Sequence, residues 1–193
     1  MSGPIMVAIA GAPGSGKSTL AEALHAKTVL HSCVIPMDGF HLDNATLEER
    51  ALLPRKGAPE TFDLTGFRKL IAALRRGQAE SFPIFDRSAD KTVPDGGIVP
   101  RSTELALIEG NYLLLDEPEW SDLQTFWDAS IWLDVPEPVL LSRLVERWTK
   151  HGLSNAEARD RAEQNDLVNA RRVMKNRLEP TWELGIAACQ QSS

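Results

Sequence analysis

The chain has 193 residues, enough for one domain with a substantial core. Its residues are 42% hydrophobic and 25% charged, which is typical of a globular protein and excludes a disordered or fibrous chain. The formal net charge of −6 argues against a general nucleic-acid-binding protein, so we expect no nucleic-acid partner.

The first predicted strand, residues 5–10, leads into the segment Gly-Ala-Pro-Gly-Ser-Gly-Lys-Ser and then into a helix that ends near Lys27. The segment matches G-x-x-x-x-G-K-[ST] at every fixed position and has the expected strand and helix on its two sides. Its glycines let backbone N–H groups converge on phosphate oxygens, and the helix N-terminus adds partial positive charge. The nucleotide-binding residues that we expect are Gly11, Ala12, Pro13, Gly14, Ser15, Gly16, Lys17, Ser18 and Thr19.

The second predicted strand, residues 32–36, places Asp38 just beyond its carboxyl end, where open α/β sheets form their sites. A carboxylate there can accept the proton of an attacking hydroxyl group if it is within hydrogen-bond reach. The alternative is an ordinary turn-forming Asp before Gly39. Position alone does not choose between the two.

Helical periodicity follows at Phe67, Leu70, Ile71 and Leu74, and the Pro- and Gly-rich residues 81–101 indicate loops or a short hairpin. The next apolar run, residues 105–108, predicts a buried strand that ends at Glu109. P-loop proteins hold Mg²⁺ at this point, directly or through water, so we favour a metal role over an ordinary strand-end carboxylate.

A further strand is predicted at residues 129–133, followed by a helix from Glu137 to about Lys150. Residues 154–157 resemble a capping box, which begins a long helix to about Leu178. Residues 181–193 show no clean final strand. This alternation of strands and helices predicts a parallel sheet covered on both faces.

The helix at residues 137–150 carries Arg143, Arg147 and Lys150 near one face and is followed by Gly152. Between residues 143 and 177 there are nine Lys or Arg against five Asp or Glu. Helical arginines before a glycine hinge can close over a triphosphate and stabilise the transferring charge. An exposed amphipathic helix would show the same pattern.

The two cysteines, Cys33 and Cys189, have no metal-ligand spacing, and Cys33 lies in an apolar run typical of the core. The N-terminal apolar run is too short to span a membrane, and it has neither a basic leader nor a cleavage site. We therefore expect a cytoplasmic protein with no membrane partner.

Taken together, these motifs resemble the uridine kinase, phosphoribulokinase and pantothenate kinase group over residues 5–178. Residues 55–63 are similar to the Lys-Gly-x-Pro-Glu-Ser-Tyr-Asp segment of pantothenate kinases, and residues 83–87 match a Pro-x-Tyr-Asp segment with Phe85 in place of Tyr. Residues 37–43 and 109–115 look closest to a bacterial branch named for fructose-transport-system kinases and for nucleoside/nucleotide kinases.

The resemblance implies an α/β fold of the P-loop NTPase type: a three-layer sandwich with a mainly parallel five-stranded sheet and a helical lid. It implies one domain over residues 1–193, with the lid at about residues 143–165. The partners expected are a small-molecule hydroxyl acceptor and, as one option, a second copy in a homodimer.

The same resemblance implies an ATP-dependent kinase that requires Mg²⁺ and phosphorylates a hydroxyl of a sugar, nucleoside or related polyol. Asp38 would be the general base, Ser18 and Glu109 would hold the metal, and Lys17, Arg143 and Arg147 would neutralise developing charge. The substrate-binding residues that it implies are Phe40, His41, Arg55, Lys56, Asp63, Arg87, Asn111 and Tyr112. A phosphorylated acceptor stays open because three of these residues are cationic.

Four other interpretations compete with this one. Residues 113–118 imitate the Walker B strand of a transporter ATPase, but the chain has no Leu-Ser-Gly-Gly-Gln signature. Residues 63–66 match the D-x-x-G of a GTPase, but there is no Asn-Lys-x-Asp motif. A P-loop ATPase without an acceptor and a nucleotide-sensing protein without catalysis both remain open.

Overall fold

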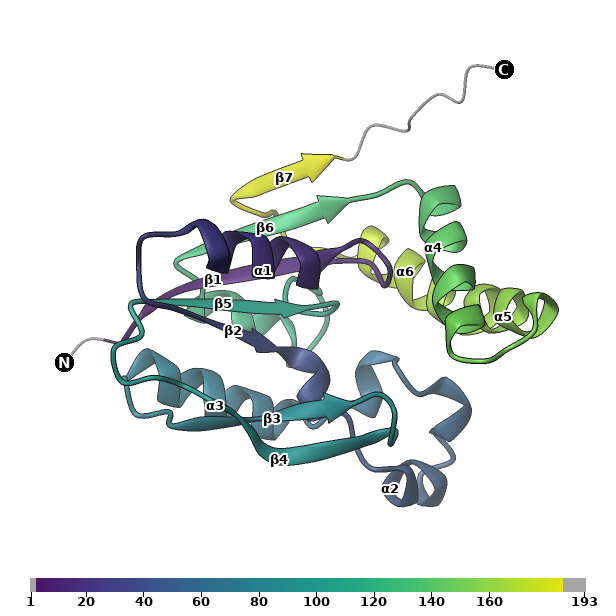
Figure 1. Ribbon diagram of the computed structural model, residues 1–193, viewed down its shortest axis with the longest axis horizontal. Helices are drawn as coiled ribbons and strands as arrows, with labels where there is room; N and C mark the ends of the chain where they lie inside the picture. Colours follow the sequence, from purple (N-terminus) through teal and green to yellow (C-terminus); the bar gives the residue numbers. More distant parts are fainter. Residues whose placement is uncertain (1–2, 186–193) are drawn as a thin grey trace.

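The computed structural model describes residues 3–185, which form a three-layer α/β sandwich around a central sheet (Figure 1). The five strands of this sheet are all parallel and lie in the order β2-β5-β1-β6-β7. Their bounds are β1 Ile5–Gly11, β2 Ser32–Pro36, β5 Leu105–Gly110, β6 Ala129–Asp134 and β7 Trp182–Gly185. The mainly parallel five-stranded sheet expected from the sequence is confirmed.

Helices cover both faces of the sheet. Their bounds are α1 Lys17–Lys27, α2 Asn44–Glu49, α3 Leu64–Arg75, α4 Glu137–Lys150, α5 Asn155–Arg161 and α6 Leu167–Lys175. Alternate residues of β1 point to opposite faces: Ile9 packs with α1, whereas Met6 and Ala8 belong to the larger core, to which α3, α4 and α6 contribute. This double burial explains why β1 is apolar without interruption.

The Pro- and Gly-rich region forms an antiparallel hairpin of β3 (Ser81–Asp86) and β4 (Lys91–Ile98), as one of the two sequence interpretations predicted. The hairpin packs beside the 3₁₀ turn η1 (Met37–Phe40) that follows β2. A Cβ atom on Gly39 would lie 1.9 Å from the carbonyl oxygen of Pro83, so only glycine allows this approach.

Two expectations about the C-terminal part were wrong. A final strand does exist, because β7 extends the sheet with Trp182 paired to Ile131 in register. Its four residues are all exposed at the sheet edge, and a run of four residues is too short to show a clear period in the sequence. Residues 186–193, with Cys189, lie outside the described part of the chain. Cys33 is buried, as expected for a core residue.

The helix expected from residue 154 to 178 is also different. A capping box at Ser154 begins α5 as predicted, but a π-helical turn, η5 (Ala162–Asp166), separates α5 from α6, and α6 ends at Lys175. Such single turns are common at functional sites. Here the turn directs Asn165 and Asp166 inward.

The carboxyl ends of the central strands bring the predicted motifs together. Glu109 lies in register with Ile9 of β1 and with Pro36 of β2, so it stands between the phosphate loop after β1 and Asp38 after β2. Within residues 3–185, no helix has the length and apolar character needed to cross a bilayer.

Candidate active site

The phosphate loop, residues 11–19, has the backbone that its glycines predict. Gly14 and Gly16 have φ angles of 81° and 99°, in the left-handed region that favours glycine. Gly16 is the N-cap of α1 and supplies no side-chain cap to the first turn of that helix. Uncapped N–H groups at a helix N-terminus form an anion-binding site.

Lys17 of the phosphate loop and Glu109 of β5 are two buried charged residues at this site. Their exposed fractions are 7% and 8%. Burial lowers the pKa of Lys17 to about 8, against the opposing field of Glu109 and Asp38. Burial also raises the pKa of the Glu109 carboxyl, and the Lys17 ammonium works against that shift. The Lys17 Nζ atom donates to the carbonyl oxygen of Ala12 at 3.0 Å.

The hydroxyl of Ser18 donates to Oε1 of Glu109 at 2.9 Å. Two oxygen atoms that could bind a metal ion therefore lie side by side next to the phosphate loop. Within the described residues no cluster of three or more His, Cys, Asp or Glu side chains forms a metal cage. Magnesium does not need one, because it keeps several waters and is usually held by one or two carboxylates plus substrate phosphates. Ser18 and Glu109 fit that donor set.

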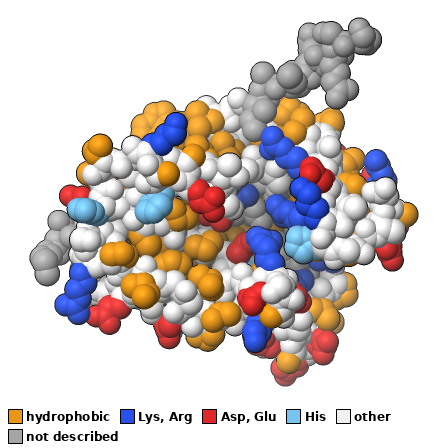
Figure 2. Space-filling model, in the orientation of Figure 1, with side chains coloured by type: hydrophobic (Ala, Val, Ile, Leu, Met, Phe, Trp, Pro, Cys, Tyr) orange, Lys and Arg blue, Asp and Glu red, His pale blue; other side chains and the backbone are white. Residues whose placement is uncertain are grey.

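Two cavities meet at this end of the sheet. The phosphate-loop cavity is lined by Gly14, Gly16, Lys17, Ser18 and Thr19 together with Arg143 and His151. The hairpin cavity lies beside it, and its polar lining includes Asp38, His41, Lys56, Asp90, Asn111 and Asp166. Arg87 and Arg147 line both cavities. Figure 2 shows Lys and Arg side chains gathered around a hollow in this face, beside acidic side chains.

Asp38 reaches the hairpin cavity from η1 and forms an ion pair with Arg87, which follows β3; the Oδ2–Nη2 distance is 2.5 Å. The side chain of Asp38 is 26% exposed and that of Arg87 is 53% exposed. The carboxylate is thus open to the cavity on one side and paired with a half-exposed cation on the other.

An aromatic wall forms another side of the hairpin cavity. The imidazole ring of His41 lies 4.1 Å from the ring of Phe62 and 4.7 Å from that of Phe85, measured between centroids. Its Nδ1 atom is 2.7 Å from the carbonyl oxygen of Asp38. Burial lowers the pKa of His41 below its ordinary value, so the ring is a neutral, flat surface near pH 7.

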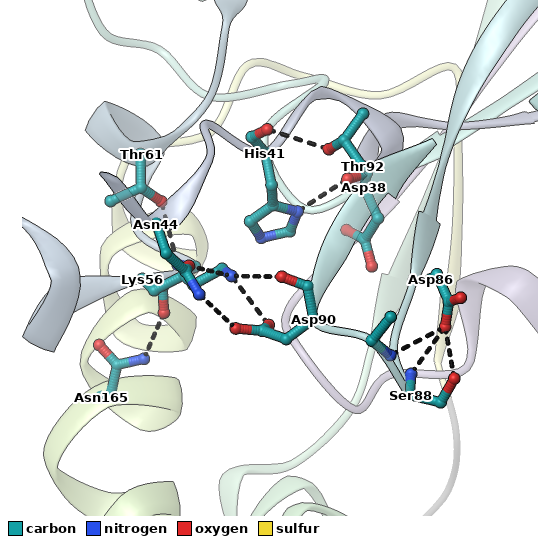
Figure 3. A network of polar contacts seen from close by, with 12 residues as sticks. Asp38, His41, Asn44, Lys56, Thr61, Asp86, Ser88, Asp90, Thr92 and Asn165 are labelled. Atoms are coloured by element: carbon teal, nitrogen blue, oxygen red, sulfur yellow. Dashed lines mark hydrogen bonds and ion pairs between the residues drawn. The ribbon is translucent and has the colours of Figure 1, made fainter. Parts of the chain in front are cut away.

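Lys56 joins the loop after α2 to the hairpin (Figure 3). Its Nζ atom donates to Asn44 at 2.7 Å and to Oδ1 of Asp90 at 2.8 Å, while Asn44 donates to Oδ2 of Asp90 at 2.9 Å. The Lys56 carbonyl oxygen accepts from Asn165 at 3.0 Å. This network ties the hairpin turn, the loop after α2 and the π-helical turn together around the cavity.

The helices α4 to α6 supply the remaining charges. Arg143 donates to the carbonyl oxygens of Gly14 and Ser15, both at 3.2 Å, so it rests directly on the phosphate loop. Burial lowers the pKa of the Arg147 guanidinium and raises that of the Asp166 carboxyl. Asp166 accepts from the indole of Trp148 at 2.6 Å.

Four of the substrate-binding residues expected from the sequence line neither cavity. Asp63 caps α3 by accepting from the Gly66 N–H at 2.9 Å, and Arg55 pairs with Glu60 at 2.6 Å. Phe40 is buried edge-on against Phe67. The buried hydroxyl of Tyr112 donates to the carbonyl oxygen of Gly57, and burial raises its pKa. These residues support the cavity walls from behind, whereas His41, Lys56, Arg87 and Asn111 line the hairpin cavity directly.

Several residues that line the hairpin cavity or hold it together were not expected from the sequence. Those that line it are Phe62, Asp90, Trp148, Arg161 and Asp166, and Asn44 supports it through Asp90. The helical period does not place Asp166 in the cavity, because the π-helical turn that directs it inward leaves no mark in the sequence pattern. An acidic residue that had suggested a transporter ATPase, Glu117, instead forms a two-point ion pair with Arg172.

Comparison with known proteins agrees with this arrangement. Residues 6–160 match the model of the Phosphoribulokinase / Uridine kinase family. A crystal structure of a "putative fructose transport system kinase" from Silicibacter sp. TM1040 is 49% identical, with a TM-score of 0.92, over 95% of this chain and 91% of that one.

Two curated relatives are also named as kinases. A "putative uridine kinase" from Schizosaccharomyces pombe is 35% identical over 91% of this chain and 80% of its own length. The pantothenate kinase of Yersinia pestis (strain Pestoides F) is 31% identical over 76% of this chain and 50% of its own length.

Proposed function

The chain belongs to the phosphoribulokinase/uridine kinase family, and from this premise we propose that it is an ATP-dependent kinase for a small-molecule alcohol. The γ-phosphoryl group of ATP would pass to a hydroxyl of a sugar, nucleoside or related polyol. The observation that carries the proposal is the contact between the two cavities: Asp38 lies in one, the phosphate loop forms the other, and Arg87 and Arg147 border both.

The donor side would hold the triphosphate on the N–H groups of the phosphate loop, with the Lys17 ammonium directed at the β- and γ-phosphates. Ser18 and Glu109 would hold Mg²⁺ through oxygen. When bound, the magnesium ion supplies positive charge that offsets the charge on the phosphate oxygens. Arg143 and Arg147 would neutralise the charge that develops during transfer.

The acceptor side would place a hydroxyl group against Asp38. Its carboxylate would orient the hydroxyl, accept its proton and so produce the nucleophile for in-line attack on the γ-phosphorus atom. The bond from the γ-phosphorus to the bridging oxygen breaks as the new bond forms, and ADP leaves. Closure of the helices at residues 143–165 would exclude water, which protects ATP from hydrolysis.

The hairpin cavity fits a hydroxyl-rich molecule. Asp38 and Asp166 offer carboxylate oxygens to hydroxyl donors, while the faces of His41 and Phe85 offer flat apolar contact to C–H groups. The curated relatives are named for uridine and pantothenate, and both molecules carry alcohol groups. These features support an alcohol acceptor without selecting one compound.

A coupled assay of ADP release tests this proposal, with and without sugars, nucleosides, pantothenate and glycerate. We expect ADP release that depends on one acceptor class and is abolished in Lys17→Ala. Equal turnover with and without every acceptor would indicate a P-loop ATPase instead. Tight ATP binding with no turnover would indicate a nucleotide sensor.

A further inference from the structure

Arg87 occupies the boundary between the two halves of the site. It lines both the phosphate-loop cavity and the hairpin cavity, and it pairs with Asp38. Among the described residues, its guanidinium makes one hydrogen bond, from Nη2 to Asp38 Oδ2. An arginine offers five N–H donors, so most of its binding capacity is open to a second partner.

The backbone around Arg87 is fixed, although its side chain is half exposed. The carboxylate of Asp86 accepts from the N–H groups of Ser88 and Ala89 at 2.9 and 3.1 Å (Figure 3). At the other end of the turn, Asp90 is held by Lys56 and Asn44. A side-chain rotation of Arg87 is therefore possible without moving the hairpin.

We propose that Arg87 exchanges partners, from Asp38 in the nucleotide-free protein to the terminal phosphate once a triphosphate fills the phosphate-loop cavity. A terminal phosphate carries more negative charge than one carboxylate and accepts two parallel N–H bonds from a guanidinium. The exchange frees Asp38 for the acceptor hydroxyl only when the phosphoryl donor is in place. The inference rests on the proposed function, because it gives Asp38 that role.

Nucleotide affinity alone tests the exchange, with a non-hydrolysable ATP analogue and ADP titrated calorimetrically in the presence of Mg²⁺. Arg87→Gln should weaken analogue binding about tenfold, the worth of one charge-assisted hydrogen bond. The affinity for ADP should change less than twofold, since ADP lacks the γ-phosphate. Arg101→Gln is the matched control, because Arg101 is 93% exposed and lines neither cavity.

A second substitution separates exchange from simple charge repulsion. Asp38→Asn releases Arg87, so it should tighten analogue binding relative to ADP in the wild-type background. If Arg87 exchanges partners, Asp38→Asn should tighten analogue binding less in the Arg87→Gln background than in the wild-type background. If Asp38 only repels the phosphate, Asp38→Asn should tighten analogue binding more in the Arg87→Gln background, because the carboxylate there has no arginine partner and faces the phosphate directly.

Equal weakening of analogue and ADP binding by Arg87→Gln would overturn the inference, as would a larger effect of Asp38→Asn in the Arg87→Gln background. Thermal unfolding of each variant checks its fold. If Arg87→Gln does not fold, Arg87→Lys replaces it. Arg87→Lys should weaken analogue binding more than ADP binding, because lysine cannot donate two parallel hydrogen bonds to one phosphate. No acceptor enters these titrations. Failure of the acceptor screen and failure of the partner exchange therefore give different results.

Discussion

Replacing Lys17 by methionine should make the nucleotide-free protein more stable while it removes nucleotide binding. Burial lowers the pKa of the Lys17 ammonium from 10.5 to about 8. Between these two pH values the unfolded chain binds more protons than the folded one, so the free energy of unfolding rises with pH in this window. Below pH 8 the folded protein bears the full cost of the buried charge.

The size of this cost follows from the same numbers. Each pKa unit corresponds to about 1.4 kcal/mol, so the buried ammonium costs the folded protein about 3 kcal/mol at pH 7. Methionine fills a similar volume but gives up the hydrogen bond to Ala12. We therefore expect Lys17→Met to add about 1–3 kcal/mol to the free energy of unfolding. Each kcal/mol corresponds to a rise of about 2–4 °C in Tm.

Urea denaturation of the ligand-free protein at pH 7 and pH 10 measures this effect, with Lys27→Met as the matched control on the exposed end of α1. The advantage of Lys17→Met should shrink as the pH approaches 10. MgATP should raise the Tm of the wild type but not of the variant. A variant that is no more stable than the wild type at pH 7, or an advantage that is independent of pH, would refute the reasoning.

Three further outcomes are expected. Asp38→Asn should lower acceptor-dependent turnover by about 10²–10⁴ with MgATP affinity retained or increased, measured by ADP release and calorimetry. Near-normal turnover would remove Asp38 from the role of base. Gly39→Ala should lower the Tm by several degrees, since its Cβ would lie 1.9 Å from the Pro83 carbonyl oxygen, and an unchanged Tm would show that the hairpin can move away. Arg172→Met should cost about 1–3 kcal/mol in urea denaturation, because two carboxylates lose their partner. Arg101→Met removes one member of a pair that is almost fully exposed, so it should change the free energy of unfolding by less than about 0.5 kcal/mol. Equal effects of the two arginine variants would contradict a stabilising role for the partly buried Arg172 network.

The donor side of the site could be predicted from the sequence because local rules determine it. The spacing of Gly11, Gly16 and Lys17 specifies the loop, and strand ends in a parallel sheet meet at one edge. That edge brings Asp38 and Glu109 toward the loop, as the registers of β5 with β1 and of β2 with β5 require.

The acceptor side was only partly predictable, because it is built by contacts between distant segments. Asp63 was expected to bind substrate, yet it stands directly before α3 and caps it. An Asp directly before a helical pattern is itself an N-cap signal, which could have given the correct assignment. Asp166 left no comparable signal, since a π-helical turn and not the helical period directs it inward.

The most direct test of the central claim is the transfer itself. The wild-type protein and Asp38→Asn are each incubated with MgATP and a metabolite pool, and the pool is compared by mass spectrometry before and after. The account predicts that one alcohol-containing metabolite gains the mass of a phosphoryl group, in step with ADP formation, with the wild type and far more slowly with Asp38→Asn. ADP formation with no phosphorylated metabolite, or the same product at the same rate from both proteins, would contradict it.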